Sequence, residues 1–452
     1  MEGKIVIGIL LTTLFATRRG YAAPADTCNA DIDTTTCGLP LDLNSEKLEF
    51  FPGIKTIEYE GPRSKNPLAF KYYNASELVH GRPMGEWLRF SVAFWHTMRG
   101  DGSDPFGSPT KRWPWEQDSE GAAATLYDHE LRRARRRLDA FFEFIRKLGV
   151  KYWCFHDRDI SPEGEDLRHT NSMFDVIIEY SRRLQKENDI RLLWGTTQLF
   201  KHPRYMHGAA TSANAKVFAY AAASVKAAME ATHRLGGSGF VFWGGREGYS
   251  TLLNTNMTLE MTNAARFFRM AKNYAQKIGF RGSLMIEPKP QEPTKHQYDW
   301  DASTTAAFLL RHGLERDFKL NIECNHATLA GHSCFHELTY ASESGLLGSI
   351  DANQGDPQTG WDTDEFLTDP REAALVALVI LQQGGLNNGG INFDAKLHRE
   401  SVSIKDLFIG HISAMDALAR GLKAAARILD DGRLQEWKKD RYSSYLDTKI
   451  GR

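Results

Sequence analysis

The chain has 452 residues, of which 42% are hydrophobic and 11% aromatic, so it can bury a substantial core in one large domain with appendages or in two to three ordinary domains. Its 56 Lys and Arg residues nearly balance its 57 Asp and Glu residues, and the formal net charge is −1 at pH 7. Such a balance excludes a global field that would draw the chain to nucleic acid or to an anionic membrane. The expected partners are therefore small molecules or other proteins.

Residues 1–23 have the pattern of a cleaved secretory signal peptide. Lys4 precedes an apolar run over 5–16, and small residues follow at 20–23, although two arginines beyond the run are atypical. The run is shorter than the roughly 20 residues that a membrane-spanning helix needs, which disfavours a retained anchor. We therefore expect secretory entry, leading to the endoplasmic reticulum, a vacuole or the cell exterior. A cysteine pair and two glycosylation sequons could serve there: Cys28, Cys37, Asn74 and Asn256.

The remaining cysteines give a different prediction. Cys154, Cys324 and Cys334 stand apart from one another and are flanked by apolar residues. This setting favours buried free thiols over a redox or zinc site.

Over residues 86–399, short β-rich runs alternate with longer amphipathic stretches. Between these runs, segments such as 130–149, 214–236 and 262–279 repeat apolar residues at spacings of three and four and end in Gly, as helices do. Eight strand-then-helix units over roughly 300 residues predict a TIM (β/α)8 barrel, an α/β fold whose functional residues lie at the C-terminal ends of its strands. The eight predicted strands are 88–95, 151–157, 190–197, 239–245, 282–288, 318–324, 346–351 and 389–394.

Carboxylates and an imidazole stand at these strand ends. In a barrel they would converge on one mouth, joined by two acids from the loop after 346–351, which share a face if that loop is extended. Two unit charges about 4 Å apart repel by roughly 4 kcal/mol at an effective dielectric near 20, so acids crowded in this way need cations or full solvation. The alternative, a solvated acidic loop, does not explain why the acids stand at strand ends. The residues are Glu287, Glu323, His326, Asp351, Asp362, Asp364 and Asp394.

Divalent cations would compensate this charge. Two of them and Lys289 supply +5 against the −6 of six carboxylates, which leaves about −1. Hard oxygen donors in this number suit Mg²⁺ or Mn²⁺, and the single nitrogen of His326 favours Mn²⁺, Mg²⁺ or Co²⁺ over a histidine-rich zinc site.

Seven short sequence motifs occur in this order: FHDRD, WGGREGY, IEPKP, NIECNHATLAGH, SIDANQG, WDTDEF and NFDAK. Together they resemble D-xylose isomerase, in the longer-chain class found in plants and many bacteria, from about residue 45 to the C-terminus. The resemblance implies interconversion of D-xylose and D-xylulose, and also of D-glucose and D-fructose, by ring opening and a metal-assisted hydride shift between C2 and C1. That reaction is an intramolecular oxidoreduction without nicotinamide.

The resemblance also implies roles for single residues. His156 and Asp159 resemble the pair that opens the sugar ring, and Lys289 resembles the lysine that hydrogen-bonds the C1 oxygen. Glu323 would bridge two divalent ions per subunit, Mg²⁺ or else Mn²⁺ or Co²⁺. The other ligands implied are Glu287, Asp351 and Asp394 for the first ion, and His326, Asp362 and Asp364 for the second.

Aromatic residues complete the predicted site. Trp95, Phe200 and Trp243 lie at or after predicted strand ends, where an apolar wall would exclude water from a hydride path. Phe106 of DPFG resembles the family residue that reaches a neighbouring subunit's site, which implies an active site shared across a dimer.

Two segments flank the barrel domain. Residues 24–85 are polar, with scattered Pro and Gly, and are interpreted as an extension packed on the barrel. Residues 400–452 are amphipathic and helical. The resemblance implies that they are an arm that embraces another subunit of a homotetramer, and a helical cap on the chain's own barrel is the alternative.

Other classes of function fit less well. A metal-dependent barrel endonuclease would need a histidine-richer metal site and a basic face for phosphates, and the sequence displays neither. A non-catalytic sugar-binding barrel protein would tolerate loss of metal ligands, yet every ligand position is retained. A phosphosugar isomerase would want a phosphate cradle in the loops after the seventh and eighth strands, and those loops are acidic.

Overall fold

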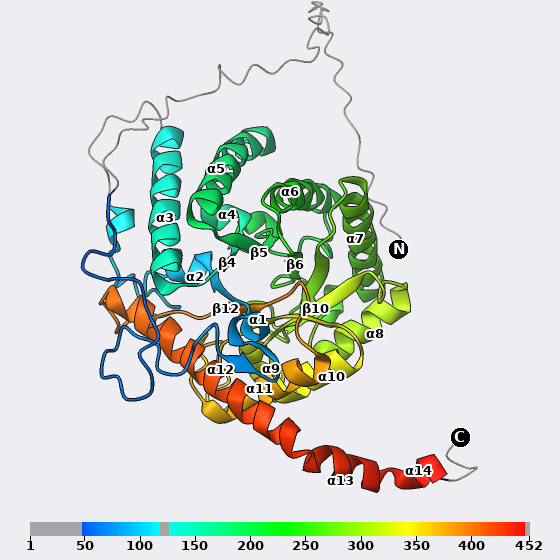
Figure 1. Cartoon of the computed structure of the whole chain (residues 1–452). Helices are drawn as coiled ribbons and strands as arrows, with labels where there is room; N and C mark the ends of the chain where they lie inside the picture. Colours follow the sequence, from blue (N-terminus) through cyan, green and yellow to red (C-terminus); the bar gives the residue numbers. More distant parts are fainter. Residues whose placement is uncertain (1–47, 118–125, 448–452) are drawn as a thin grey trace, which may run out of the picture. The chain divides into compact units, whose positions relative to one another are not determined.

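Eight short strands close into a parallel barrel in the computed structural model, which describes residues 48–117 and 126–447 (Figure 1). Each strand pairs with the next along the chain, and the last pairs with the first through Ile391 and Phe90. The predicted TIM barrel and its eight strands are thereby confirmed, although each strand is shorter than predicted. In chain order they are β3 (Phe90–Ala93), β4 (Tyr152–His156), β5 (Arg191–Thr196), β6 (Gly239–Trp243), β8 (Ser283–Glu287), β10 (Phe318–Glu323), β11 (Leu347–Asp351) and β12 (Ile391–Phe393).

The strands are buried on both faces, which is why most of them are apolar almost throughout. β10 differs, because Lys319, Asn321 and Glu323 alternate with apolar residues. One small cluster, formed by Cys154, Leu193, Trp194, Val241 and Met285, is separate from the main hydrophobic core. At the entry to β12, a Cβ on Gly389 would lie 1.8 Å from the carbonyl oxygen of Gly348, so only glycine allows β11 and β12 to approach here.

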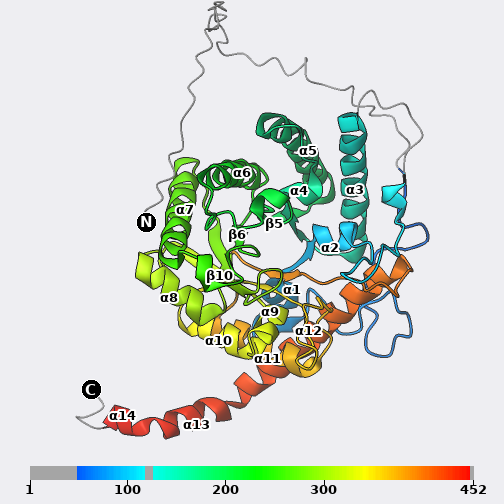
Figure 2. The same ribbon diagram turned by 180° about the vertical axis from the view of Figure 1, so that it is seen from behind.

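Helices surround the barrel, as the two opposite views show for α3, α5, α6, α7 and α8 (Figures 1 and 2). Side chains cap the starts of several of these helices: Asp166 accepts from the backbone N–H of His169 at α5, and Asp301 accepts from that of Thr304 at α8. The main helices are α3 (Leu126–Leu148), α5 (Leu167–Asn188), α6 (Ala215–Arg234), α7 (Met257–Lys277), α8 (Ala302–His312), α10 (Cys334–Glu343), α11 (Pro370–Gln383) and α12 (Lys405–Asp431).

Shorter elements fill the connections. Several of them follow a barrel strand directly and therefore border the barrel mouth, as α2, α4 and α9 do. They are α1 (Met84–Leu88), α2 (Phe94–Arg99), α4 (Asp157–Ile160), α9 (Cys324–Leu329), α13 (Arg433–Arg441), α14 (Ser443–Asp447), the 3-10 turns Pro114–Glu116, Pro203–Tyr205 and Leu252–Asn254, and the paired strands β1 (Leu78–Val79) with β2 (Arg82–Pro83) and β7 (Gly248–Tyr249) with β9 (His296–Gln297).

The segments on either side of the barrel contact each other. Backbone N–H groups of residues 71–73 donate to the carboxylate of Asp416 on α12 at 2.8–3.1 Å. Helix α12 packs against α11, whereas α13 and α14 lead away from the barrel (Figures 1 and 2). Apolar side chains on these two helices and at the residue between them are exposed: Leu434, Trp437, Tyr442, Tyr445 and Leu446.

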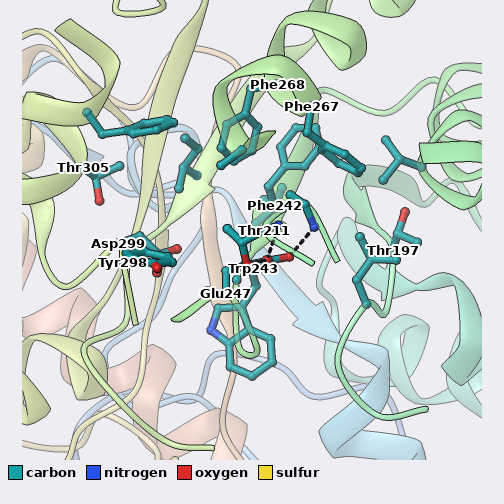
Figure 3. Close-up of a pocket in the computed structure, with 18 of the residues that line it drawn as sticks. Thr197, Thr211, Phe242, Trp243, Glu247, Phe267, Phe268, Tyr298, Asp299 and Thr305 are labelled. Carbon is teal, nitrogen blue, oxygen red and sulfur yellow. Dashed lines mark hydrogen bonds between the residues drawn. The ribbon is translucent and has the colours of Figure 1, made fainter. Parts of the chain in front are cut away.

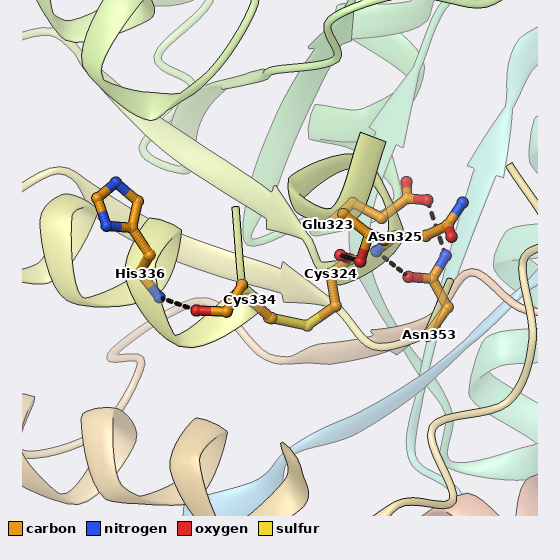
Figure 4. Close-up of a disulfide and its surroundings, with 8 residues drawn as sticks. Glu323, Cys324, Asn325, Cys334, His336 and Asn353 are labelled. Carbon is orange, nitrogen blue, oxygen red and sulfur yellow. Dashed lines mark hydrogen bonds between the residues drawn. A yellow bond between two sulfur atoms is a disulfide. The ribbon is translucent and has the colours of Figure 1, made fainter. Parts of the chain in front are cut away.

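The prediction of free thiols is wrong for two cysteines. Cys324 and Cys334 form a disulfide that joins the first residue of α9 to the first residue of α10 (Figure 4). Their separation of ten residues hid the pair, because only the turn between the two helices brings the cysteines together. Cys154 is a buried free thiol, as predicted, and burial raises its pKa.

The predicted signal peptide, Cys28 and Cys37 lie outside the described residues. Within 48–117 and 126–447, no helix has both the length and the apolar character needed to cross a bilayer.

Candidate metal centre and active site

Four strand-end carboxylates meet at the barrel mouth. Glu287, Glu323 and Asp351 are the last residues of β8, β10 and β11, and Asp394 directly follows β12. One oxygen from each lies within 4.8 Å of the others, and every one of these side chains is buried. Parallel strands direct their C-terminal ends to the same mouth, which is how residues more than 100 positions apart come together.

A second group overlaps the first. Oxygens of Glu323, Asp362 and Asp364 lie within 4.8 Å of one another. The Nε2 atom of His326 is 3.2 Å from Glu323 Oε1 and 3.8 Å from Asp362 Oδ2, while its Nδ1 faces the Pro288 carbonyl at 3.1 Å. Asp364 has a φ of +48°, so the loop is not extended at this residue. The two aspartates converge nonetheless.

Cationic side chains border these groups. The ammonium of Lys289 contacts the carboxylate of Asp362, and Lys396 Nζ lies 2.6 Å from Asp364 Oδ2. His96 Nε2 is 2.9 Å from Asp394 Oδ1 and 3.3 Å from Asp364 Oδ2. Lys396 and His96 were not predicted, although each stands within two residues of a predicted site residue.

Buried amides hold the carboxylates in place. Asn321 donates to Glu287 at 2.9 Å and to Asp351 at 2.7 Å, and Asn392 donates to Asp351 at 2.9 Å. Asn353 donates to Glu323 Oε1 at 2.7 Å and to the Asp394 carbonyl at 2.8 Å. None of these three amides was predicted. Strand alternation could have found Asn321, which precedes Glu323 by two and therefore points to the same face.

The shifts in pKa indicate that the positive charge near the buried carboxylates does not balance their negative charge. Burial, followed by the charges of neighbouring acids, raises the pKa of Glu287, Glu323 and Asp351 well above the usual range. Burial and Asp364 raise the pKa of Asp362 to about 7. For Asp364, burial is outweighed by His96 and Lys396, so its pKa falls well below normal. Oxygen-rich donors that share Glu323 and include one imidazole fit divalent cations, which would favour the ionised carboxylates.

These shifts predict how metal and pH together set stability. A carboxyl whose pKa is raised in the folded state stabilises that state at low pH, and this contribution is lost as pH rises from the unfolded pKa to the folded one. For these acids the window starts at the ordinary 3.8–4.5 and reaches about 7 for Asp362. Bound cations offset the loss, so Mn²⁺ should raise the melting temperature more at about pH 7.5 than at about pH 5. Thermal unfolding in EDTA and in Mn²⁺ at both pH values measures the difference. Equal increments would contradict the prediction.

A histidine–carboxylate pair lies beside the aromatic wall. The Nδ1 atom of His156 is 3.2 Å from Asp159 Oδ2, and Gln198 donates to Asp159 Oδ1 at 3.2 Å. Burial raises the pKa of Asp159, but the hydrogen bond and charge of His156 and the cationic neighbours Arg99 and Lys201 outweigh it, and the pKa is lowered. Asp159 is therefore ionised and can hold a proton on His156 Nδ1.

The aromatic residues predicted as a wall contact one another through His156. Trp95 packs edge-on against the His156 ring at 4.3 Å, and Phe200 lies 5.7 Å from His156 and 4.5 Å from Trp243. Trp243 also lies 5.3 Å from the ammonium of Lys289. The prediction that Trp95 ends the first strand is wrong, because Trp95 lies in α2. From there its indole N–H donates to Asp394 Oδ1 at 2.8 Å.

Phe106 stands apart from this wall. It is 85% exposed and stacks on Trp361, which is 62% exposed, at 6.3 Å. The structure therefore does not bring Phe106 into its own chain's wall.

A separate cavity of about 60 Å³ lies between strands β5, β6 and β8 and helices α6, α7 and α8 (Figure 3). It is lined mostly by apolar side chains such as Phe242, Phe267 and Phe268. Glu247 accepts from the backbone N–H groups of residues 209–211 at its edge, and burial raises the pKa of Asp299 to about 8. It shares Trp243 with the aromatic wall but contains none of the grouped carboxylates.

The fold and the two carboxylate groups define a TIM-barrel protein whose acidic clusters can hold divalent metal ions. No family model matches the chain. It is 55% identical over 449 residues to a xylose isomerase of Arabidopsis thaliana, covering 99% of this chain and 91% of that one. It is also 55% identical to the Hordeum vulgare xylose isomerase (100% and 91%) and 54% identical to that of Thermotoga sp. strain RQ2 (88% and 88%). The chain belongs to the xylose isomerase family and is a sugar aldose–ketose isomerase, which is an intramolecular oxidoreductase.

Proposed function

We propose that the chain interconverts D-xylose and D-xylulose, and also D-glucose and D-fructose, with two divalent ions per subunit, Mg²⁺ or else Mn²⁺ or Co²⁺. The observation that supports this most directly is the pair of carboxylate groups that share Glu323 at the barrel mouth. Glu287, Glu323, Asp351 and Asp394 would hold one ion. His326, Asp362 and Asp364 would hold the other together with Glu323. When bound, the ions would polarise the sugar oxygens and assist a hydride shift between C2 and C1.

The His156–Asp159 pair would open the sugar ring. Ionised Asp159 favours the tautomer with the proton on Nδ1, which leaves Nε2 of His156 free to exchange a proton with the ring oxygen. Gln198 fixes the other oxygen of Asp159 and so restrains the pair.

Lys289 would stabilise negative charge on the C1 oxygen. Burial lowers its pKa, but the adjoining Asp362 carboxylate outweighs burial, so the pKa is raised and the ammonium stays protonated. A protonated lysine in a buried site donates strongly to a developing oxyanion.

The surroundings favour hydride transfer over an enediol path. The strand-end carboxylates are committed to the proposed ions, which leaves no obvious free base beside C2. Trp95, Phe200 and Trp243 supply an apolar wall that excludes water from the transfer path.

Assembly and destination are proposals of the same kind. We propose a homotetramer in which Phe106 completes a neighbouring subunit's site and residues 400–452 provide an arm, supported by the exposure of Phe106 and of the apolar residues on α13 and α14. We also propose secretory entry through residues 1–23, supported by their sequence pattern.

Turnover of D-xylose by the leader-free protein tests the proposed activity. We expect D-xylulose formation to disappear after EDTA treatment and to return with Mg²⁺ or Mn²⁺, because the chain provides oxygen donors for such ions. Apoprotein in buffer alone is the control for losses during handling. Failure to turn over xylose or glucose with any divalent ion would overturn the proposal and favour a sugar-binding protein, whereas metal-dependent cleavage of DNA would favour an endonuclease.

A further inference from the structure

A third group of side chains of the types that can bind metal lies outside the barrel mouth, at the start of α10. His332 precedes this helix, and His336 and Glu337 lie in its first turn. One ring nitrogen from each histidine and one oxygen of Glu337 lie within 4.8 Å of one another. The two imidazole rings are nearly parallel, with centroids 4.5 Å apart and an interplanar angle of 17°. We propose that His332, His336 and Glu337 form a binding site for a divalent transition metal of the zinc type.

The carboxylates around this group are held by one oxygen each. Glu337 Oε2 accepts from the backbone N–H of Ala302 at 2.7 Å, while Oε1 faces His336 Nε2 at 3.9 Å. Asp301 Oδ1 accepts from the Thr304 N–H at 2.6 Å, while Oδ2 lies 3.4 Å from His332 Nε2. A histidine that binds metal through one nitrogen commonly donates from the other to a carboxylate. Asp301 can therefore restrain the His332 ring beside the group.

The ligands stand on a segment that is fixed yet open to solvent. Cys334 lies between the two histidines and is bonded to Cys324, and Ser333 caps α10 by accepting from the His336 N–H at 3.2 Å (Figure 4). His332 and His336 side chains are 32% and 53% exposed, whereas that of Glu337 is 5% exposed. Burial, and to a lesser degree Asp301, raises the pKa of Glu337, so a cation here would favour its ionised form. Figure 4 shows His336 on the far side of the disulfide from Glu323 and Asn353.

The donor set selects a different ion from the barrel mouth. Two imidazoles and one carboxylate with an open position are an arrangement used for zinc, and nitrogen donors also suit Co²⁺, Ni²⁺ and Cu²⁺. Mg²⁺ prefers oxygen donors and dehydrates reluctantly, so it favours the carboxylates of the mouth. The chain would thus bind two kinds of metal ion at sites on separate elements.

Zinc stoichiometry tests the proposal. Full-length protein, in millimolar Mg²⁺ and micromolar Zn²⁺, is dialysed to equilibrium and its bound zinc counted by mass spectrometry. We expect the double variant His332→Gln/His336→Gln to bind one Zn²⁺ fewer per chain than the unsubstituted protein. Its magnesium-dependent turnover should be unchanged, since neither residue lies in the mouth.

The matched control is His233→Gln, an exposed histidine in the last turn of α6. It should bind as much zinc as the unsubstituted protein. Zinc bound at the barrel mouth adds equally to the zinc count of all three proteins, because all three keep the mouth ligands. Circular dichroism checks that the double variant is folded, and with that established, equal zinc counts in all three proteins would overturn the site.

Discussion

Replacing Glu323 by Gln is expected to reduce kcat/KM for D-xylose by more than about 100-fold, since even residues that only orient a metal ligand contribute about 10–100-fold. Glu323 contributes an oxygen to both carboxylate groups, so the substitution removes one negative ligand from each. An amide still accepts the hydrogen bond from Asn353, so packing changes little. Xylulose formation in saturating Mg²⁺, together with the number of ions bound per chain, measures the effect.

The control for this variant is Glu343→Gln, an exposed acid at the end of α10. It loses the same charge and should retain normal turnover and normal metal content. If the Glu323→Gln protein bound two ions and kept activity within a few fold, the shared-ligand arrangement would be wrong. A variant that binds fewer ions yet turns over normally would show that one of the two ions is not required.

Removing the Cys324–Cys334 disulfide is expected to lower the free energy of unfolding by about 2–3 kcal/mol, because the bond closes a short loop in the unfolded chain. The double variant Cys324→Ala/Cys334→Ala makes this change. The bond also joins the starts of α9 and α10, and α9 has six residues and no side-chain N-cap, so it gains little stability by itself. Glu323 and His326 flank Cys324, and we expect weaker metal binding in the variant as well.

Chemical denaturation at one protein concentration, with EDTA, measures the stability term. A reductant such as TCEP provides the internal control: it should destabilise the unsubstituted protein more than the double variant. If the two proteins unfolded at the same denaturant concentration without reductant, the disulfide would have no measurable role.

The strand-end acids could be predicted because a parallel barrel converts position along the chain into position in space. Once the eight strands were assigned, Glu287, Glu323, Asp351 and Asp394 had to face one mouth, and they do. The roles assigned to these residues, and the domain boundaries at 23, 85 and 399, stay predictions.

Features set by loops and by packing were beyond the sequence. The left-handed backbone of Asp364 and the disulfide both depend on how a turn closes, which periodicity does not encode. His96 and Lys396 were missed for another reason. Each pairs with an acid that is distant in sequence: His96 with Asp364 and Asp394, and Lys396 with Asp364. Such pairs are visible only once the loops have been placed in space.

The hydrogen bond from Trp95 to Asp394 has a consequence for how the protein is made. Its two residues are 299 positions apart. This side of the mouth therefore forms only after the last strand, β12, has been synthesised and has paired with the first, β3. Contacts of such long sequence separation form slowly and late in folding. The first carboxylate group is complete only when Asp394 has joined Glu287, Glu323 and Asp351. Capture of metal by the first group would therefore report the moment of ring closure, and Mn²⁺ binding during refolding could time it.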